Sequence, residues 1–198
     1  MLSPGGGRPL FGGAMSARVP PGARDVSDLR EVPDHQEVFA HGHTDQSLVV
    51  ELLELQAHVA DRDAARYHFE DLAGSNEARG GPGTRSVSAA AALPRSELAL
   101  VQCSSAWVLS GAQCVSKFNE EARNEVAVHL GLFRLPQFST DVLVTFNDPV
   151  RISPDSSSAP GPSGPSGPSG PQSAEPWTVH DFHRLLHSLT LHDPGLFG

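Results

Sequence analysis

One segment of the chain has apolar residues at alternate positions, as a strand of a half-buried β-sheet does, and a second strand-like segment follows it. The first, 124–135 (NEVAVHLGLFRL), has apolar residues at alternate positions: Val126, Val128, Leu130 and Leu132. A period of two places these side chains on one face of a strand. The second segment, 141–147 (DVLVTFN), follows after a few residues. The two are therefore predicted to pair as antiparallel strands of a sheet built from hairpins.

Further strands are predicted on both sides of this pair. The segment 46–56 is apolar on both parities, which fits a strand buried on both faces or a buried helix, and β-branched Val49 and Val50 favour the strand. Shorter strands are expected at 10–19 and 37–40. Segments 106–109 and 113–118 flank Ser110-Gly111, a dipeptide typical of hairpin turns.

Helices are predicted at three places. Asp25 or Ser27 can cap a short helical turn through Arg30, and 60–74 has a helical pattern that ends at Gly74. In 176–191, four apolar residues lie on one face at helical spacing, which predicts a helix docked on the sheet: Phe182, Leu185, Leu186 and Leu189. The expected fold class is α/β, a single domain with an antiparallel β-sheet flanked by helices.

Glycine and proline, 19 and 17 of the 198 residues, are concentrated in a few segments. Residues 1–8 are expected to form a disordered tail and residues 9–198 one domain. A flexible insertion is predicted at 75–95, around Gly80-Gly81-Pro82-Gly83. A second is predicted at 153–174, where three Gly-Pro-Ser triplets are too few for a collagen helix. Because an amphipathic helix follows it, this linker is interpreted as an insertion within the domain.

The negative charge of the chain is also concentrated. Thirteen acidic and four basic residues lie between Arg24 and Glu77, and this excess of nine acids equals the net charge of −9. An acidic surface argues against nucleic acid or anionic lipid as the ligand, since both require neutralisation of phosphates. It suits a basic protein partner, although a solubilising surface explains a charge excess equally well. No apolar run suits a signal peptide or membrane insertion, so a soluble intracellular protein is expected. It is also expected to be a monomer.

The sequence contains no recognisable catalytic constellation or Walker-type phosphate loop, so no catalytic residue and no cofactor is predicted. His180, His183 and His187 share a helical face at a spacing that could bind a metal. Because no cysteine or carboxylate completes the set, a solvated face is favoured and no metal is predicted. Trp107 and Trp177 are interpreted as core residues, and Cys103 and Cys114 as buried or free thiols.

Several stretches, taken in order, resemble the Ran guanine nucleotide release factor family. They are PLFGGAMSARVPPGARDVSDLREVPDHQEVF (9–39), TDQSLVVELLELQAHVADRDAARYHFEDLAG (44–74), LFRLPQFSTDVLVTFNDP (132–149) and SLTLHDPGLFG (188–198). The resemblance implies a PsbP-like fold, binding to the small GTPase Ran and stimulation of guanine nucleotide release. It further implies a role in nuclear import and export, with localisation in nucleus and cytoplasm. For vertebrate relatives it implies delivery of the cardiac voltage-gated sodium channel to the cell surface.

The resemblance also implies that the Ran-binding residues are acidic. Glu51 and Glu54 are the strongest candidates, and the weaker ones are Asp25, Glu31, Asp34 and Glu37. Carboxylates beside a bound nucleotide could compete for the P-loop lysine or repel the phosphates, and either effect would speed release. Positions 51 and 54 face opposite sides of a regular strand, so a bulge, strand end or helical turn would be needed to bring them together.

Overall fold

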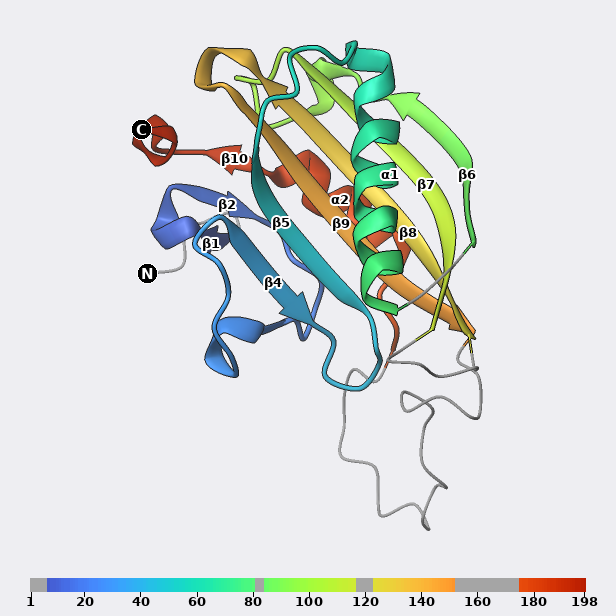
Figure 1. Cartoon of the computed structure of the whole chain (residues 1–198). Helices are drawn as coiled ribbons and strands as arrows, with labels where there is room; N and C mark the ends of the chain where they lie inside the picture. The colour runs from blue at the N-terminus through green and yellow to red at the C-terminus, as the bar shows by residue number, and fades with distance from the viewer. Residues whose placement is uncertain (1–6, 81–83, 117–122, 152–174) are drawn as a thin grey trace.

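A computed structural model describes residues 7–80, 84–116, 123–151 and 175–198 of the chain. Seven strands form one antiparallel sheet in the order β3-β4-β5-β9-β8-β7-β6, and three short strands form a second sheet in the order β1-β2-β10 (Figure 1). The large sheet consists of β3 (Arg24–Asp25), β4 (Gln36–Ala40), β5 (Ser47–Glu54), β6 (Thr84–Ala92), β7 (Ser105–Ser116), β8 (Arg123–Leu135) and β9 (Thr140–Arg151). The small sheet consists of β1 (Arg8–Leu10), β2 (Met15–Ala17) and β10 (Thr190–Leu191).

The predicted pair of strands is confirmed as β8 and β9, which are antiparallel neighbours. Successive side chains of a strand point to opposite faces, so the apolar side chains of this pair are divided between two core clusters, one on each face of the sheet. On one face, Leu130 and Leu132 pack with Phe69 of helix α1 (Asp61–Gly80). On the other, Phe133 and Phe146 pack with helix α2 (Val179–Ser188) and with the small sheet. The sheet is thus the middle layer of the domain.

Helix α2 docks as the sequence predicts. Thr178 and Asp181 form a reciprocal capping box that satisfies N–H groups of the first turn. The four predicted apolar side chains are buried: Phe182, Leu185, Leu186 and Leu189. Gly131 of β8 lies directly beneath Leu186, where a methyl group would clash with the leucine side chain. Trp177, just before the helix, is buried and donates its indole N–H to the carbonyl of Pro21 at 3.0 Å.

The prediction of one strand over 10–19 is wrong. The segment forms β1 and β2, joined by a one-turn 3-10 helix in which Phe11, Gly12 and Gly13 have positive φ angles. Two consecutive glycines adopt this conformation readily, and so the chain reverses direction here. Arg8, expected in a disordered tail, is the first residue of β1.

The predicted hairpin turn at Ser110-Gly111 is also wrong, because both residues lie within the continuous strand β7. Gly111 serves close packing: a Cβ atom here would lie 2.5 Å from the Ser86 carbonyl oxygen and 3.0 Å from the Phe69 ring. The absence of a side chain lets α1 and β6 approach β7 at this position.

The expectation of a flexible insertion over 75–95 requires correction. Helix α1 continues through Gly80, and β6 pairs with β7 along its length, with a register shift between Val87 and Ala89. The predicted linker at 153–174 lies outside the described residues, as does the end of the segment expected at 113–118. Within the described part of the chain, neither helix has the length and apolar character needed to cross a membrane.

Candidate partner-binding surface

The predicted acidic residues lie on β3, β4, β5 and the segment that joins β3 to β4. Helix α1 packs over β6, β7 and β8, and in Figure 1 the strands β4 and β5 lie to the left of this helix. The α1 side of β4 and β5 is therefore not covered by a helix in the described part of the chain. Side chains of β4 and β5 that point to the α1 side therefore lie on an open half of the sheet.

Glu51 points to this open side. It shares its parity with Val49 and Leu53, and Leu53 packs against the α1 core cluster. Its cross-strand neighbour on β4 is Gln36, and its carboxylate lies 3.6 Å from the His35 imidazole. The side chain of Glu51 retains 24% exposure, so one carboxylate oxygen can reach a partner while the other contacts His35.

Glu54 is the last residue of β5 and is exposed. Its side chain lies on the same face of β5 as those of Val50 and Leu52, which pack on the α2 side. The pairing of β5 with β9 continues through Glu54 without a register shift, so no bulge turns it toward Glu51. Three residues separate the two carboxylates by about 10 Å along the strand. The structure thus places them on opposite faces, at one end of the same strand.

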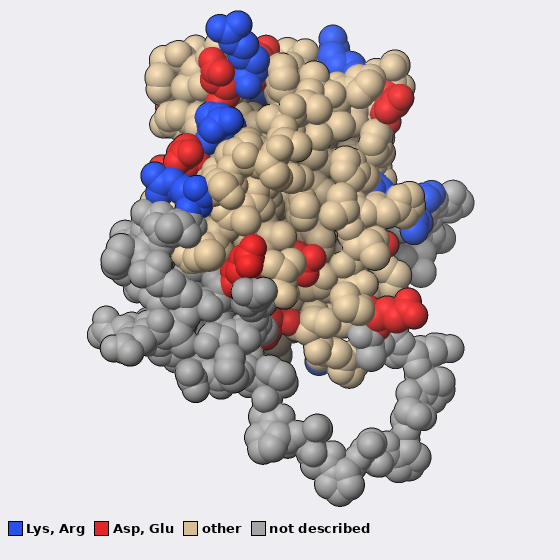
Figure 2. Space-filling model, turned by 90° about the vertical axis from the view of Figure 1, so that its right-hand side faces the viewer, with Lys and Arg blue, Asp and Glu red and all other residues tan. Residues whose placement is uncertain are grey.

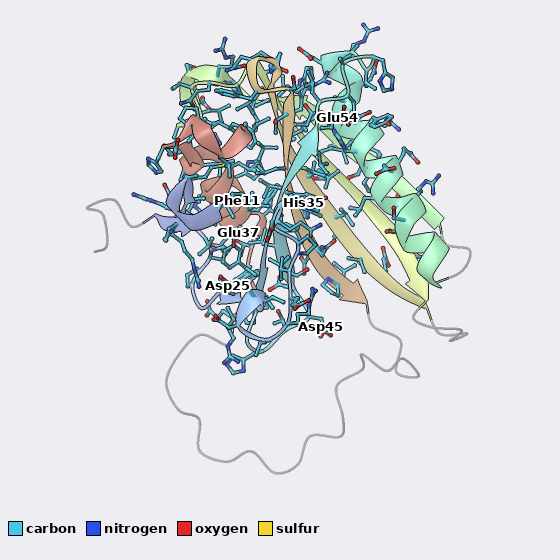
Figure 3. The ribbon with its side chains drawn as sticks, turned by 60° about the vertical axis from the view of Figure 1, so that its left-hand side comes forward. Phe11, Asp25, His35, Glu37, Asp45 and Glu54 are labelled. Atoms are coloured by element: carbon cyan, nitrogen blue, oxygen red, sulfur yellow. The ribbon has the colours of Figure 1, made fainter. Side chains whose placement is uncertain are left out.

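Asp25 and Glu37 have structural partners. Asp25 caps the 3-10 helix Val26–Asp28, where its Oδ1 accepts hydrogen bonds from the Ser27 backbone N–H at 2.9 Å and hydroxyl at 2.6 Å. This confirms the predicted helical turn. The Glu37 carboxylate accepts the Phe11 N–H at 2.6 Å, and Figure 3 shows the two residues next to each other. Both carboxylates therefore fix backbone segments within the domain.

Glu31 and Asp34 are exposed residues of the segment between the 3-10 helix and β4. This segment ends at His35, whose carbonyl accepts the Leu52 N–H at 2.9 Å, so it borders Glu51. It also carries Leu29, which sequence reasoning missed and which is 79% exposed. An apolar residue in a loop has no periodic pattern that could have identified it. We use the name acidic surface for Glu31, Asp34, Glu51 and Glu54.

The other side of the molecule has a different character. Figure 2 shows the side that is on the right in Figure 1, where acidic and basic side chains are scattered over a largely uncharged surface. In Figure 3, which brings the left-hand side of Figure 1 forward, the labelled Asp25, Glu37, Asp45 and Glu54 lie along the side that β4 and β5 present.

Of the three histidines of α2, His183 and His187 are partly buried and His180 is exposed. His187 is paired through Nδ1 with the Glu97 carbonyl at 3.0 Å, and its ring centroid is 6.4 Å from that of His183. Burial lowers the pKa of His183, with a further contribution from the neighbouring His187 and His180. Among the described residues, no group of three or more histidine, cysteine, aspartate or glutamate side chains is arranged to hold a metal ion. The two cysteines are free, and Cys103 is buried.

Comparison with known proteins identifies the family. Residues 8–149 match the family model described as Ran-interacting Mog1 protein. The Ran guanine nucleotide release factor of Danio rerio is 59% identical over 191 residues, which cover 96% of this chain and 99% of the relative. The Homo sapiens protein of the same name is 52% identical over 193 residues, covering 96% and 95%. The nuclear import protein MOG1 of Saccharomyces cerevisiae is 31% identical over 153 residues, covering 71% and 65%.

A solved structure agrees with the fold. The crystal structure of the Saccharomyces cerevisiae Ran-binding protein Mog1p superposes with a TM-score of 0.67 at 22% identity and covers 97% of each chain. At this identity the likeness establishes the α/β fold with its antiparallel sheet. The family match spans well over half of the sequence, and the vertebrate relatives align along nearly all of it. The chain belongs to the Ran-interacting Mog1 protein family.

Proposed function

We propose that this protein binds the small GTPase Ran and promotes release of its guanine nucleotide, in support of nuclear transport. The observation that carries the proposal is family membership, with vertebrate relatives named as Ran guanine nucleotide release factors and yeast relatives as nuclear import proteins. The acidic surface supplies the chemistry. It has the sign that a basic partner requires, with Glu51 on the open side of the sheet and Glu54 at the exposed end of the same strand.

We propose that Glu51 and Glu54 contact Ran directly, with Glu31 and Asp34 beside them. Asp25 and Glu37 support this surface by fixing the segments that carry it. A small GTPase holds its nucleotide through a P-loop lysine and a magnesium ion that bridges the phosphates. A carboxylate brought next to these groups can bind the lysine or repel the phosphates. Both effects lower nucleotide affinity without a covalent step, so the protein acts as a regulator.

Release of a fluorescent guanine nucleotide from purified Ran tests the proposal. The parent protein should accelerate release, and Glu51→Lys with Glu54→Lys should abolish most of the acceleration, since attraction becomes like-charge repulsion. Association of the parent should slow with added salt, because the Debye length falls from about 10 Å at 0.1 M to about 3 Å at 1 M. The charge-reversed variant should lose much of this salt dependence.

The single variants Glu54→Lys and Glu97→Lys form a matched pair, because both change the net charge equally. Glu97 is exposed and belongs to the segment that joins β6 to β7, where its backbone carbonyl contacts His187 of α2. We expect Glu97→Lys to release nucleotide at the parent rate. A folded charge-reversed double variant that matches the parent would show that Glu51 and Glu54 are not the site. A parent protein that leaves the release rate unchanged would contradict the function itself.

The sodium-channel role stays a prediction, since no described feature bears on it.

A further inference from the structure

A buried cluster of charged groups lies behind the end of β5, on the α1 side of the sheet. Arg134 of β8 and Asp141 of β9 are cross-strand partners with 3% and 0% exposure, and Arg134 Nε donates to Asp141 Oδ1 at 3.1 Å. The other oxygen of Asp141 lies 3.0 Å from Nε2 of the buried His68 of α1. The cluster therefore joins β8, β9 and α1.

The remaining donors of Arg134 bind the loop that follows Glu54. Its Nη2 donates to the Gln56 carbonyl at 2.6 Å, and its Nη1 to the Val59 carbonyl at 2.7 Å. The same Nη1 lies 2.9 Å from Oδ1 of Asp61, the first residue of α1. One guanidinium group thus holds both halves of the loop 55–60 and the start of the helix. The planar, forked geometry of arginine makes these bonds possible at the same time.

The loop presents an aromatic pair next to Glu54. The Tyr67 hydroxyl donates to Gln56 Oε1 at 3.3 Å, and the Tyr67 ring packs edge-on against exposed His58, with 5.8 Å between the centroids. Tyr67 keeps 39% exposure. Tyrosine is enriched among residues that dominate binding at protein interfaces. The loop and these two rings therefore form a rigid extension of the acidic surface.

Stability alone does not account for a buried ion pair in this position. The desolvation cost of two buried charges offsets most of their attraction, and well-packed apolar residues often stabilise a fold equally well. What the pair provides in addition is a fixed loop conformation. A loop held rigid before binding loses less entropy when a partner docks on it.

We infer that Arg134, together with Asp141, is a positioning residue for partner binding: it fixes the loop 55–60, so that Glu54, His58 and Tyr67 meet the GTPase as a preformed unit. The inference rests on the proposed function, which supplies the partner. It adds the loop and its aromatic pair to the contact surface. It also explains how Arg134 and Asp141, both buried, can influence binding of the GTPase through the loop.

The test replaces the pair without leaving a buried charge alone. Arg134→Met with Asp141→Asn removes both charges and keeps an oxygen acceptor for His68. We expect the complex with purified Ran to dissociate about tenfold faster or more. The salt dependence of association should match that of the parent, because the surface charge is unchanged. Amide hydrogen exchange of residues 55–60 should quicken while exchange in the centres of β8 and β9 stays as in the parent.

A double-mutant cycle with Tyr67→Ala separates positioning from a general loss of stability. If Arg134 acts through the loop, Tyr67→Ala should weaken Ran binding in the parent and have little further effect in the Arg134→Met, Asp141→Asn background. The control removes another ion pair, Arg85 with Glu70 at 2.6 Å between β6 and α1, as Arg85→Met with Glu70→Gln. This control should bind as the parent does. Should the test variant fail to fold, Arg134→Lys replaces it, since lysine keeps the charge but cannot reach both carbonyls.

The outcomes separate this inference from the proposed function. If Glu54→Lys weakens Ran binding but the folded test variant dissociates at the parent rate, the positioning role is wrong and the proposed function stands. If loop exchange is unchanged, the positioning role is equally wrong. If the parent does not bind Ran at all, the proposed function fails, and hydrogen exchange alone still shows whether Arg134 fixes the loop.

Discussion

The carboxylates of the predicted site differ in what they contact: some fix backbone segments of the domain, and others are exposed. Glu37 accepts the N–H of Phe11, a residue with a φ angle of 51°. A left-handed conformation is unfavourable for phenylalanine and persists only when the surroundings support it. Glu54, by contrast, is exposed, and among the described residues no hydrogen bond or ion pair reaches its carboxylate. Its charge is therefore available to a partner.

This difference leads to opposite expectations for two alanine variants. Glu37→Ala leaves the partly buried Phe11 N–H without its acceptor, and we expect a loss of about 1–3 kcal/mol in the free energy of unfolding. Glu54→Ala should change stability by less than about 0.5 kcal/mol. Urea denaturation monitored by circular dichroism measures both. Equal midpoints for Glu37→Ala and the parent would show that the Phe11 N–H finds another acceptor.

At the scale of the elements, α2 is the clearest test of the core. Phe182 is 1% exposed and stacks with Phe146 of β9 at a centroid distance of 6.0 Å. Phe182→Ala should therefore lower the free energy of unfolding by about 3–5 kcal/mol. His180, exposed on the same helix, provides the control, and His180→Ala should have almost no effect. Thermal unfolding of the two variants measures both effects. Equal losses of stability in the two variants would mean that the helix is not docked as described.

The elements also show what the sequence could and could not predict. Strand β8 and helix α2 were predictable from their side-chain periods, whereas β5, apolar on both parities, was recognised by its β-branched Val49 and Val50. Strand β6 was missed because its alanine-rich segment has no strong strand preference of its own and depends on pairing with β7. The turn predicted at Ser110-Gly111 is wrong because the glycine is needed for close packing against Phe69, and not for a turn. The opposite faces of Glu51 and Glu54 followed from strand parity alone, whereas the contact of Glu37 with Phe11 depends on tertiary structure.

At the scale of the whole molecule, two histidines link stability to pH. His129 of β8 stacks with Phe146 and lies beside α2, and its ring centroid is 6.1 Å from that of Phe182. Burial lowers its pKa from the usual 6.5; the nearby Asp148 opposes this shift, and His183 adds to it. Burial also lowers the pKa of His183, and its neighbours His187 and His180 add to that shift. Both rings therefore resist protonation in the folded state.

The sign of the pH effect follows from proton uptake. In the unfolded chain both histidines titrate near 6.5, so below that pH the unfolded state binds more protons than the folded state, and stability falls as the pH falls. The loss begins at about pH 7 and continues until the pH passes below the folded pKa values, while well above pH 7 these groups have no effect.

We expect the melting temperature to drop between about pH 7.5 and pH 5.5, a window in which most carboxylates stay ionised. The variant His129→Gln, which can still hydrogen-bond to Ser110, should lose less over the same interval. A melting temperature of the parent protein that stays constant or rises toward pH 5.5 would contradict this prediction. It would mean that folding does not lower the pKa of His129 and His183.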